Sequence, residues 1–173
     1  MSNSQLATRN SQLFTNSPIC TIFSKPTLQE SKMYLVRLIY TSEISDGFGP
    51  NDIEDILEKA KQNNAESNVT GLLCFNSSHF MQCLEGSRKA VNDTYHRILN
   101  DKRHRNIIML NYCEIVEREF ENWSMGYIPN SKMTTPLNLK YSGTSEFNPL
   151  AMSAGSAHKL MLALRDSLLK HTM

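Results

Sequence analysis

The sequence has no excess of either charge and no long apolar run. Its 173 residues include 18 Lys and Arg against 17 Asp and Glu, for a formal net charge of +1. Binding to a phosphate backbone needs a basic surface, so we expect no nucleic acid partner. No segment approaches the roughly 20 apolar residues of a membrane helix, and the N-terminus lacks the charged start and apolar core of a signal peptide. We therefore expect a cytoplasmic protein without a membrane partner.

Motifs for metal binding and for common enzyme chemistry are also missing. The four cysteines have neither CxxC nor Cys/His metal spacing, and no P-loop or GxGxxG occurs. Cys74 and Cys83 lie in apolar runs, where free cysteine behaves as a small buried hydrophobe. His79, His96 and His104 are scattered, without the adjacent Ser or Cys that an activated nucleophile needs. We expect inert core thiols, no metal and no enzymatic activity.

The remaining pattern predicts one α+β domain with an extension at each end. Residues 1–32, rich in Ser, Asn, Gln and Thr, predict a flexible N-terminal extension. Alternation over 34–40 predicts a strand, and Asn51 is the expected N-cap of a following helix. Apolar runs at 69–75 and 79–84, around a turn-forming Asn-Ser-Ser, predict a β-hairpin. A second helix is predicted over 88–99, a strand over 107–116, and a short final strand within 120–127.

The order β-α-β-β-α-β is that of a ferredoxin-like fold, an antiparallel sheet with two helices on one face. Its other face needs a cover. Leu160, Leu164 and Leu168 recur at i, i+4 and i+8 in a predicted helix over 157–169, which suits such a C-terminal cap. We therefore expect a sheet domain over 33–129 and a connector with cap helix over 130–173.

Polar side chains interrupt these apolar elements. Gln82 lies in a buried strand pattern, Tyr40 lies at the end of the first strand, and Asn63 and Asn64 are near the end of the first helix. A buried amide without a partner costs roughly 1–3 kcal/mol, so Gln82 must be solvated, paired or facing a polar ligand. The set predicts hydrogen bonds around a flat polar ligand.

These same residues resemble the signature of BLUF domains, the blue-light sensors that bind FAD. The matching pieces are Tyr40 in Leu-Ile-Tyr-Thr-Ser, the segment from Asn63-Asn64 to Thr70-Gly71, Gln82 in Met-Gln-Cys-Leu-Glu-Gly, and Trp123-Ser124-Met125. The resemblance covers about residues 33–129. One departure is Asn63, which stands where many members carry histidine.

The resemblance implies FAD as cofactor and a role for each site residue. Those expected to bind it are Tyr40, Ile56, Asn63, Asn64, Leu73, Gln82, Arg103 and His104, the last two from the end of the second helix. It implies that light drives electron and proton transfer from Tyr40 and leaves the Gln82 amide rotated or tautomerised, in a reversible red-shifted state. Trp123 and Met125, expected on one face of the final strand, would relay the signal.

The resemblance also implies partners. Short BLUF proteins often form rings or dimers through C-terminal helices, so a homo-oligomer and a downstream protein effector of unknown identity are expected. The residues leave one alternative open, a light-independent interaction module with an empty or vestigial flavin pocket. Colour separates the two, because only a photoreceptor retains flavin through purification.

Overall fold

The computed structural model describes residues 34–129, 131 and 134–171. The chain divides into two units, residues 1–31 and 32–173, and every feature below belongs to the second. The predicted N-terminal extension, residues 1–32, lies outside the described residues.

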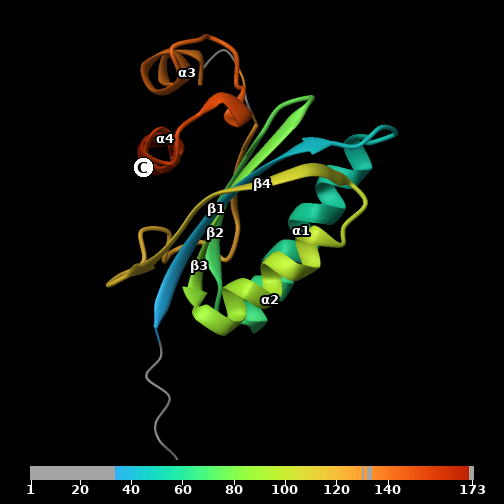
Figure 1. The fold of residues 1–173 in the computed structure, drawn as a ribbon, viewed down its shortest axis with the longest axis vertical. Helices are drawn as coiled ribbons and strands as arrows, with labels where there is room; N and C mark the ends of the chain where they lie inside the picture. The colour runs from blue at the N-terminus through green and yellow to red at the C-terminus, as the bar shows by residue number, and fades with distance from the viewer. Residues whose placement is uncertain (1–33, 130, 132–133, 172–173) are drawn as a thin grey trace, which may run out of the picture. The chain divides into compact units, whose positions relative to one another are not determined.

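A five-stranded sheet is the centre of this unit (Figure 1). Its strands are β1 (Leu35–Ile44), β2 (Thr70–Phe75), β3 (His79–Ser87), β4 (His104–Ile115) and β5 (Gly126–Pro129), in the order β4-β1-β3-β2-β5. β1 is antiparallel to β3 and β4, and β2 is antiparallel to β3, which confirms the predicted ferredoxin-like fold. The short β5 differs from the prediction because it joins β2 in parallel.

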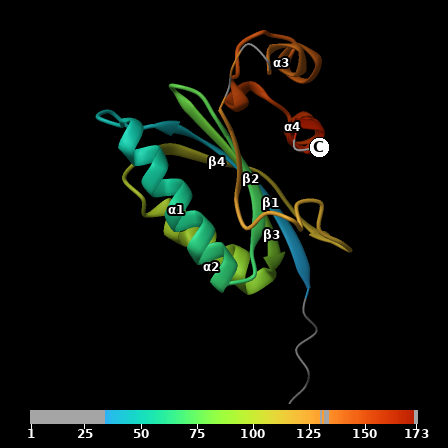
Figure 2. The same cartoon turned by 180° about the vertical axis from the view of Figure 1, so that it is seen from behind.

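Helices α1 (Pro50–Glu66) and α2 (Arg88–Leu99) lie on one side of the sheet (Figures 1 and 2). α2 has its predicted bounds, with the Ser87 hydroxyl accepting from the Ala90 N–H at 3.2 Å. The predicted Asn51 cap of α1 is wrong. Gly49 is the N-cap, and its N–H donates to the Asp52 carboxylate at 2.8 Å. Pro50 then fills the first helical position, where its missing N–H costs nothing.

Alternation along the strands divides the buried side chains into two cores. The core facing α1 and α2 includes Val36, Leu38, Tyr40, Phe80, Leu84 and Val91. The core on the opposite face includes Ile39, Cys74, Met81, Cys83, Leu160 and Leu164. Cys74 and Cys83 are free and buried here, and burial raises the pKa of the Cys74 thiol to about 12 and that of the Cys83 thiol well above its ordinary value. Both thiols therefore stay protonated near neutral pH.

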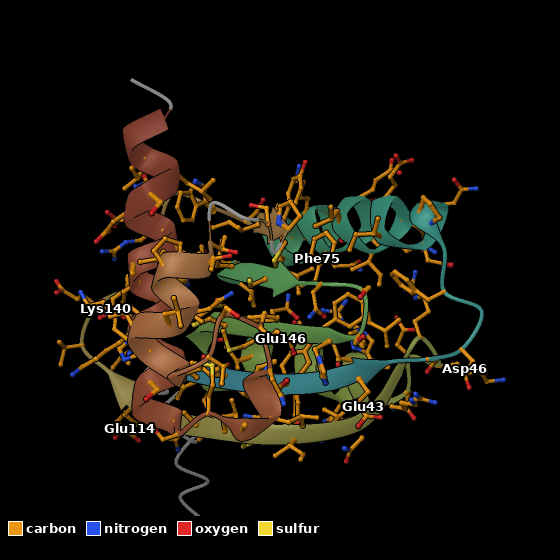
Figure 3. All side chains as sticks on the ribbon, turned by 90° about the horizontal axis from the view of Figure 1, so that it is seen from above. Glu43, Asp46, Phe75, Glu114, Lys140 and Glu146 are labelled. Atoms are coloured by element: carbon orange, nitrogen blue, oxygen red, sulfur yellow. The ribbon has the colours of Figure 1, made fainter. Side chains whose placement is uncertain are left out.

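The C-terminal region is more structured than the predicted connector. It contains α3 (Thr135–Ser142), a short 3-10 helix η1 (Pro149–Ala151) and α4 (Ala154–His171). The predicted connector thus contains a helix of its own, and the cap helix extends beyond its predicted range of 157–169 at both ends. Leu137 and Tyr141 of α3 pack against the same core as α4, and these tertiary contacts stabilise a helix too short to persist alone. Figure 3 shows α4 near the end of the sheet where Glu114 is labelled, away from Glu43 and Asp46. Within the described residues, no helix is long and apolar enough to cross a membrane, and no group of three or more His, Cys, Asp or Glu could hold a metal ion.

Candidate functional site

A cavity of about 220 Å³ lies between α1, α2 and the facing side of the sheet. A single buried water needs only roughly 10–15 Å³ of such space, so this cavity is of ligand size. The residues predicted for cofactor binding all line it: Tyr40, Ile56, Asn63, Asn64, Leu73, Gln82, Arg103 and His104. The structure therefore brings the predicted set together, while their contacts with a ligand stay a prediction.

A continuous hydrogen-bonded chain joins Tyr40, Gln82 and Met125 at the wall of this cavity. Tyr40 on β1 and Gln82 on β3 are direct cross-strand partners, so their side chains leave the sheet on the same face. The Tyr40 hydroxyl donates to Gln82 Oε1 at 2.6 Å, and Gln82 Nε2 donates to Met125 Sδ at 3.3 Å. Burial raises the pKa of the Tyr40 phenol above its ordinary value, so the phenol keeps its proton at rest.

Met125 and Trp123 do not share a face, which corrects the prediction made for them. Both precede β5, in an irregular segment where the two-residue repeat of a strand does not apply. Met125 is 3% exposed and belongs to the core facing α1 and α2, whereas Trp123 packs against the opposite core. In this structure it is therefore Met125 that contacts Gln82.

Asn64, at the end of α1, connects the helix to this same irregular segment. It is 1% exposed, and its Nδ2 donates to the backbone oxygen of Ser124 at 2.8 Å. Its own backbone oxygen accepts from the Val69 N–H at 2.8 Å, which fixes the turn into β2. The Asn64 amide is consequently held at the cavity wall, next in sequence to the cavity-lining Asn63.

Arg103 and His104 lie at another part of the cavity wall, but not at the end of α2 as predicted. α2 ends at Leu99, Arg103 lies in the following turn, and His104 begins β4. Arg103 pairs with Asp55 and with Asp101, each at 2.6 Å, so α1 and the turn hold its guanidinium between them.

His104 is a neutral ring in this wall. Its Nδ1 lies 2.7 Å from the Ser42 hydroxyl, and its ring centroid is 4.6 Å from that of Phe80. Burial lowers the pKa of His104 to about 4, so the imidazole is uncharged at neutral pH. It can position neighbours by hydrogen bonding without placing a charge beside Tyr40.

Six residues that line the cavity were not predicted from the sequence as site residues. They are Lys59, Ala60, Thr94, Arg97, Ile98 and Asp101. A signal for two of them existed, because Thr94 and Ile98 are four residues apart on the predicted second helix and therefore share a face. Lys59 and Arg97 gave no such signal, since charged residues on a helix are usually solvated.

The fold and cavity define a ferredoxin-like domain with a ligand-sized cavity between its two helices and its sheet. Residues 35–126 match the family model described as BLUF, sensors of blue-light using FAD. This match spans more than half of the chain, so the chain belongs to the BLUF family of flavin-based blue-light photoreceptors.

Individual relatives agree with this assignment. The chain is 45% identical over 76 residues to the blue light- and temperature-regulated antirepressor BluF of Escherichia coli K12, covering 44% of this chain and 19% of that protein. It is 35% identical over 86 residues to the photoactivated adenylate cyclase subunit alpha of Euglena gracilis, covering 50% of this chain and 8% of that protein. The chain thus aligns with a fifth or less of either protein.

Solved structures agree over a larger part of the chain. BlsA in its photo-activated state superposes with a TM-score of 0.68 at 31% identity, covering 73% of this chain and 91% of BlsA. The BLUF protein BlrB in its dark state gives 0.59 at 29% identity, covering 62% of this chain and 83% of BlrB.

The side chains around the cavity fit the flavin that BLUF domains bind. Apolar walls from Ile56, Leu73 and Ile98 suit a flat ring system, and Asn63 and Gln82 carry amides that can meet its polar edge. The Gln82 amide has two N–H donors, and its partner Met125 is a thioether, which is only a weak acceptor. A polar ligand would be the better acceptor for this buried amide.

Proposed function

We propose that this chain is a blue-light photoreceptor that holds FAD in the cavity between α1, α2 and the sheet. The observation that carries the proposal is the Tyr40–Gln82–Met125 chain, because Tyr40 and Gln82 line the cavity while Met125 leads away from it. When bound, the flavin ring supplies a group that absorbs blue light and becomes a strong one-electron oxidant. All of the remaining chemistry falls to the protein.

The polar wall would orient the cofactor. By family resemblance, Asn64 would bind one polar edge of the flavin ring and Arg103 would donate toward another carbonyl of it, with His104 nearby. The ion pairs of Arg103 with Asp55 and Asp101 support this role, since they hold the guanidinium at the cavity wall. Lys59 and Arg97 add positive charge to the lining, which suits the phosphates of FAD.

Tyr40 and Gln82 would carry the photochemical step. With the bound, excited flavin as the electron acceptor, loss of an electron from Tyr40 would make its phenol proton strongly acidic, and the 2.6 Å hydrogen bond would give that proton a direct route to Gln82 Oε1. When the electron and the proton return to Tyr40, the Gln82 amide is left rotated or in its tautomeric form. No net redox change remains, but the hydrogen bonds at the cavity wall differ, which produces a small red shift.

The output would be a changed contact with another protein. We propose that the chain acts in the cytoplasm, forms a homo-oligomer through its C-terminal region and signals to a protein effector. The description of the relative BluF as an antirepressor supports an effector that is a protein. The exposed side chains Leu139 of α3 and Leu169 of α4, 52% and 44% exposed, support an interface in this region.

The test is an absorption spectrum of the full chain, purified in the dark and then illuminated with blue light. We expect a flavin spectrum that moves slightly to the red and reverts in the dark, and extraction should release FAD rather than FMN. A flavin spectrum that does not move would contradict the photoswitch. Colourless protein after reconstitution with FAD would support the interaction module instead.

A further inference from the structure

A buried ion pair lies on the face of the sheet opposite the cavity. Arg37 on β1 and Glu85 on β3 are cross-strand partners, and Arg37 Nε donates to Glu85 Oε1 at 2.9 Å. Their side chains are 8% and 0% exposed. Removing two charges from water is costly, so such a pair is weak evidence for stability alone.

The second carboxylate oxygen of Glu85 binds the backbone of a distant segment. It accepts from the backbone N–H groups of Glu119 and Phe120, at 2.8 and 3.0 Å. The Glu85 carboxylate therefore fixes the start of the segment 119–125 onto the sheet. Charge-assisted bonds of this kind are short and directional, so they define the position of that backbone closely.

Glu119 connects this anchor to α4. Its carboxylate pairs with Arg37 and lies 2.6 Å from Nε2 of His158 on α4. Its backbone oxygen accepts from Nη1 of Arg165, also on α4, at 2.9 Å. Two side chains of α4 thus contact one residue, Glu119. We call the cluster of Glu119, Arg37, His158 and Arg165 the Glu119 latch.

The other end of the segment 119–125 lies at the photoswitch. Met125 Sδ accepts from Gln82, and the Ser124 backbone oxygen accepts from Asn64. β3 therefore holds both ends of this segment, through Gln82 on the cavity face and Glu85 on the opposite face. The segment passes from one face of the sheet to the other, between β4 and β5 in the chain.

We propose that Glu119 is a positioning residue that couples the Gln82–Met125 contact to the docking of α4, an inference that rests on the proposed function. While Gln82 donates to Met125, the segment 119–125 keeps the geometry that the latch needs. A Gln82 amide that presents its oxygen to the sulfur loses this contact, because both atoms are acceptors. The segment then shifts, the carboxylate of Glu119 loses its alignment with His158, and α4 loosens.

The experiment is hydrogen exchange of the α4 backbone amides in the full flavin-loaded chain, in the dark and under continuous blue light. In the native protein we expect exchange in α4 to become roughly 10- to 100-fold faster in light, as expected for loss of one charged hydrogen bond. Glu119→Gln keeps the shape but removes the charge. It should bring α4 to the fast rate already in the dark and remove the light effect, while the red shift is retained. Glu117→Gln, the same change at an exposed position nearby, should behave like the native protein.

The outcomes separate this inference from the proposed function. A native light effect on α4 that persists in Glu119→Gln, or a native red shift without any change in α4, would overturn the latch. Should Glu119→Gln fail to fold, His158→Ala takes its place, because it removes the contact on α4 while Arg37 and Glu85 stay paired. A light effect on α4 that persists in His158→Ala, or a native red shift without any change in α4, would then overturn the latch. If the native protein shows no red shift, the proposed function fails. The latch is then tested by dark exchange of flavin-free protein, where equal α4 rates in Glu119→Gln and native chains would overturn it.

Discussion

Replacing Tyr40 with Phe removes one hydroxyl from the centre of the site. That hydroxyl donates to Gln82 Oε1 at 2.6 Å, and the two residues are 1% and 6% exposed. A buried acceptor left without its donor costs about 1–3 kcal/mol. This is less than the stability of about 5–15 kcal/mol that is typical of a folded domain, so the variant should fold and retain flavin. With a urea slope of about 1–3 kcal/mol per molar, we expect the unfolding midpoint to fall by roughly 1 M.

The functional effect of Tyr40→Phe should be complete, because Tyr40 is the one side chain among the described residues that donates to Gln82 Oε1. We expect an ordinary flavin spectrum without a light-induced red shift. Tyr95→Phe is the matched control, since this second buried tyrosine has its ring centroid 5.7 Å from that of Tyr40. The control should keep the shift. A normal reversible shift in Tyr40→Phe would refute the role assigned to Tyr40. Loss of the red shift in both variants would show that the effect is not specific to the Tyr40 hydroxyl.

Three further changes test the same site. Gln82→Leu removes both the acceptor for Tyr40 and the donor to Met125, so flavin should stay while the red shift disappears; a normal shift would exclude Gln82 from the photoswitch. Met125→Ala removes only the far end of the chain, so the shift should persist with a changed dark-recovery rate; an unchanged rate, timed by absorbance, would reduce Met125 to packing. Burial lowers the pKa of His104 to about 4, so between about pH 6.5 and 4 the unfolded chain binds one proton more than the folded chain. The free energy of unfolding should therefore fall by up to roughly 3 kcal/mol as the pH decreases through this window. His104→Asn should show a smaller loss in urea titrations across these pH values, and equal losses would contradict the shifted pKa.

The fold could be predicted where local pattern decides structure. Alternation over residues 34–40 predicts a strand whose successive side chains face opposite ways, and Val36 and Leu38 indeed belong to one core and Ile39 to the other. Prediction failed where tertiary contacts decide. α3 has almost no amphipathic pattern to find, and it forms because Leu137 and Tyr141 have a core to pack against. This core is built from residues distant in sequence, so the local pattern of residues 135–142 could not predict the helix.

The same distinction applies to the site. Tyr40 and Gln82 lie in strands, where alternation fixes only which residues of the same strand share their face. The observed register is what brings the two side chains together on one face of the sheet. Met125 and Trp123 lie in an irregular segment, for which no period exists, and their opposite orientations could not be derived. Glu85 and its partner Arg37 are far apart in sequence, and only the fold brings the two side chains together.

The spacing within β3 explains how a change at the cavity could reach the other side of a rigid sheet. Gln82 and Glu85 are three residues apart, an odd number, so they must project from opposite faces. Close packing leaves little room for motion through the sheet itself, and both residues are held by cross-strand partners. The segment 119–125 contacts Gln82 through Met125 and Glu85 through the backbone of Glu119. When the Gln82–Met125 contact is lost, a displacement of Met125 can therefore travel along this segment toward Glu119, while β3 itself stays in place.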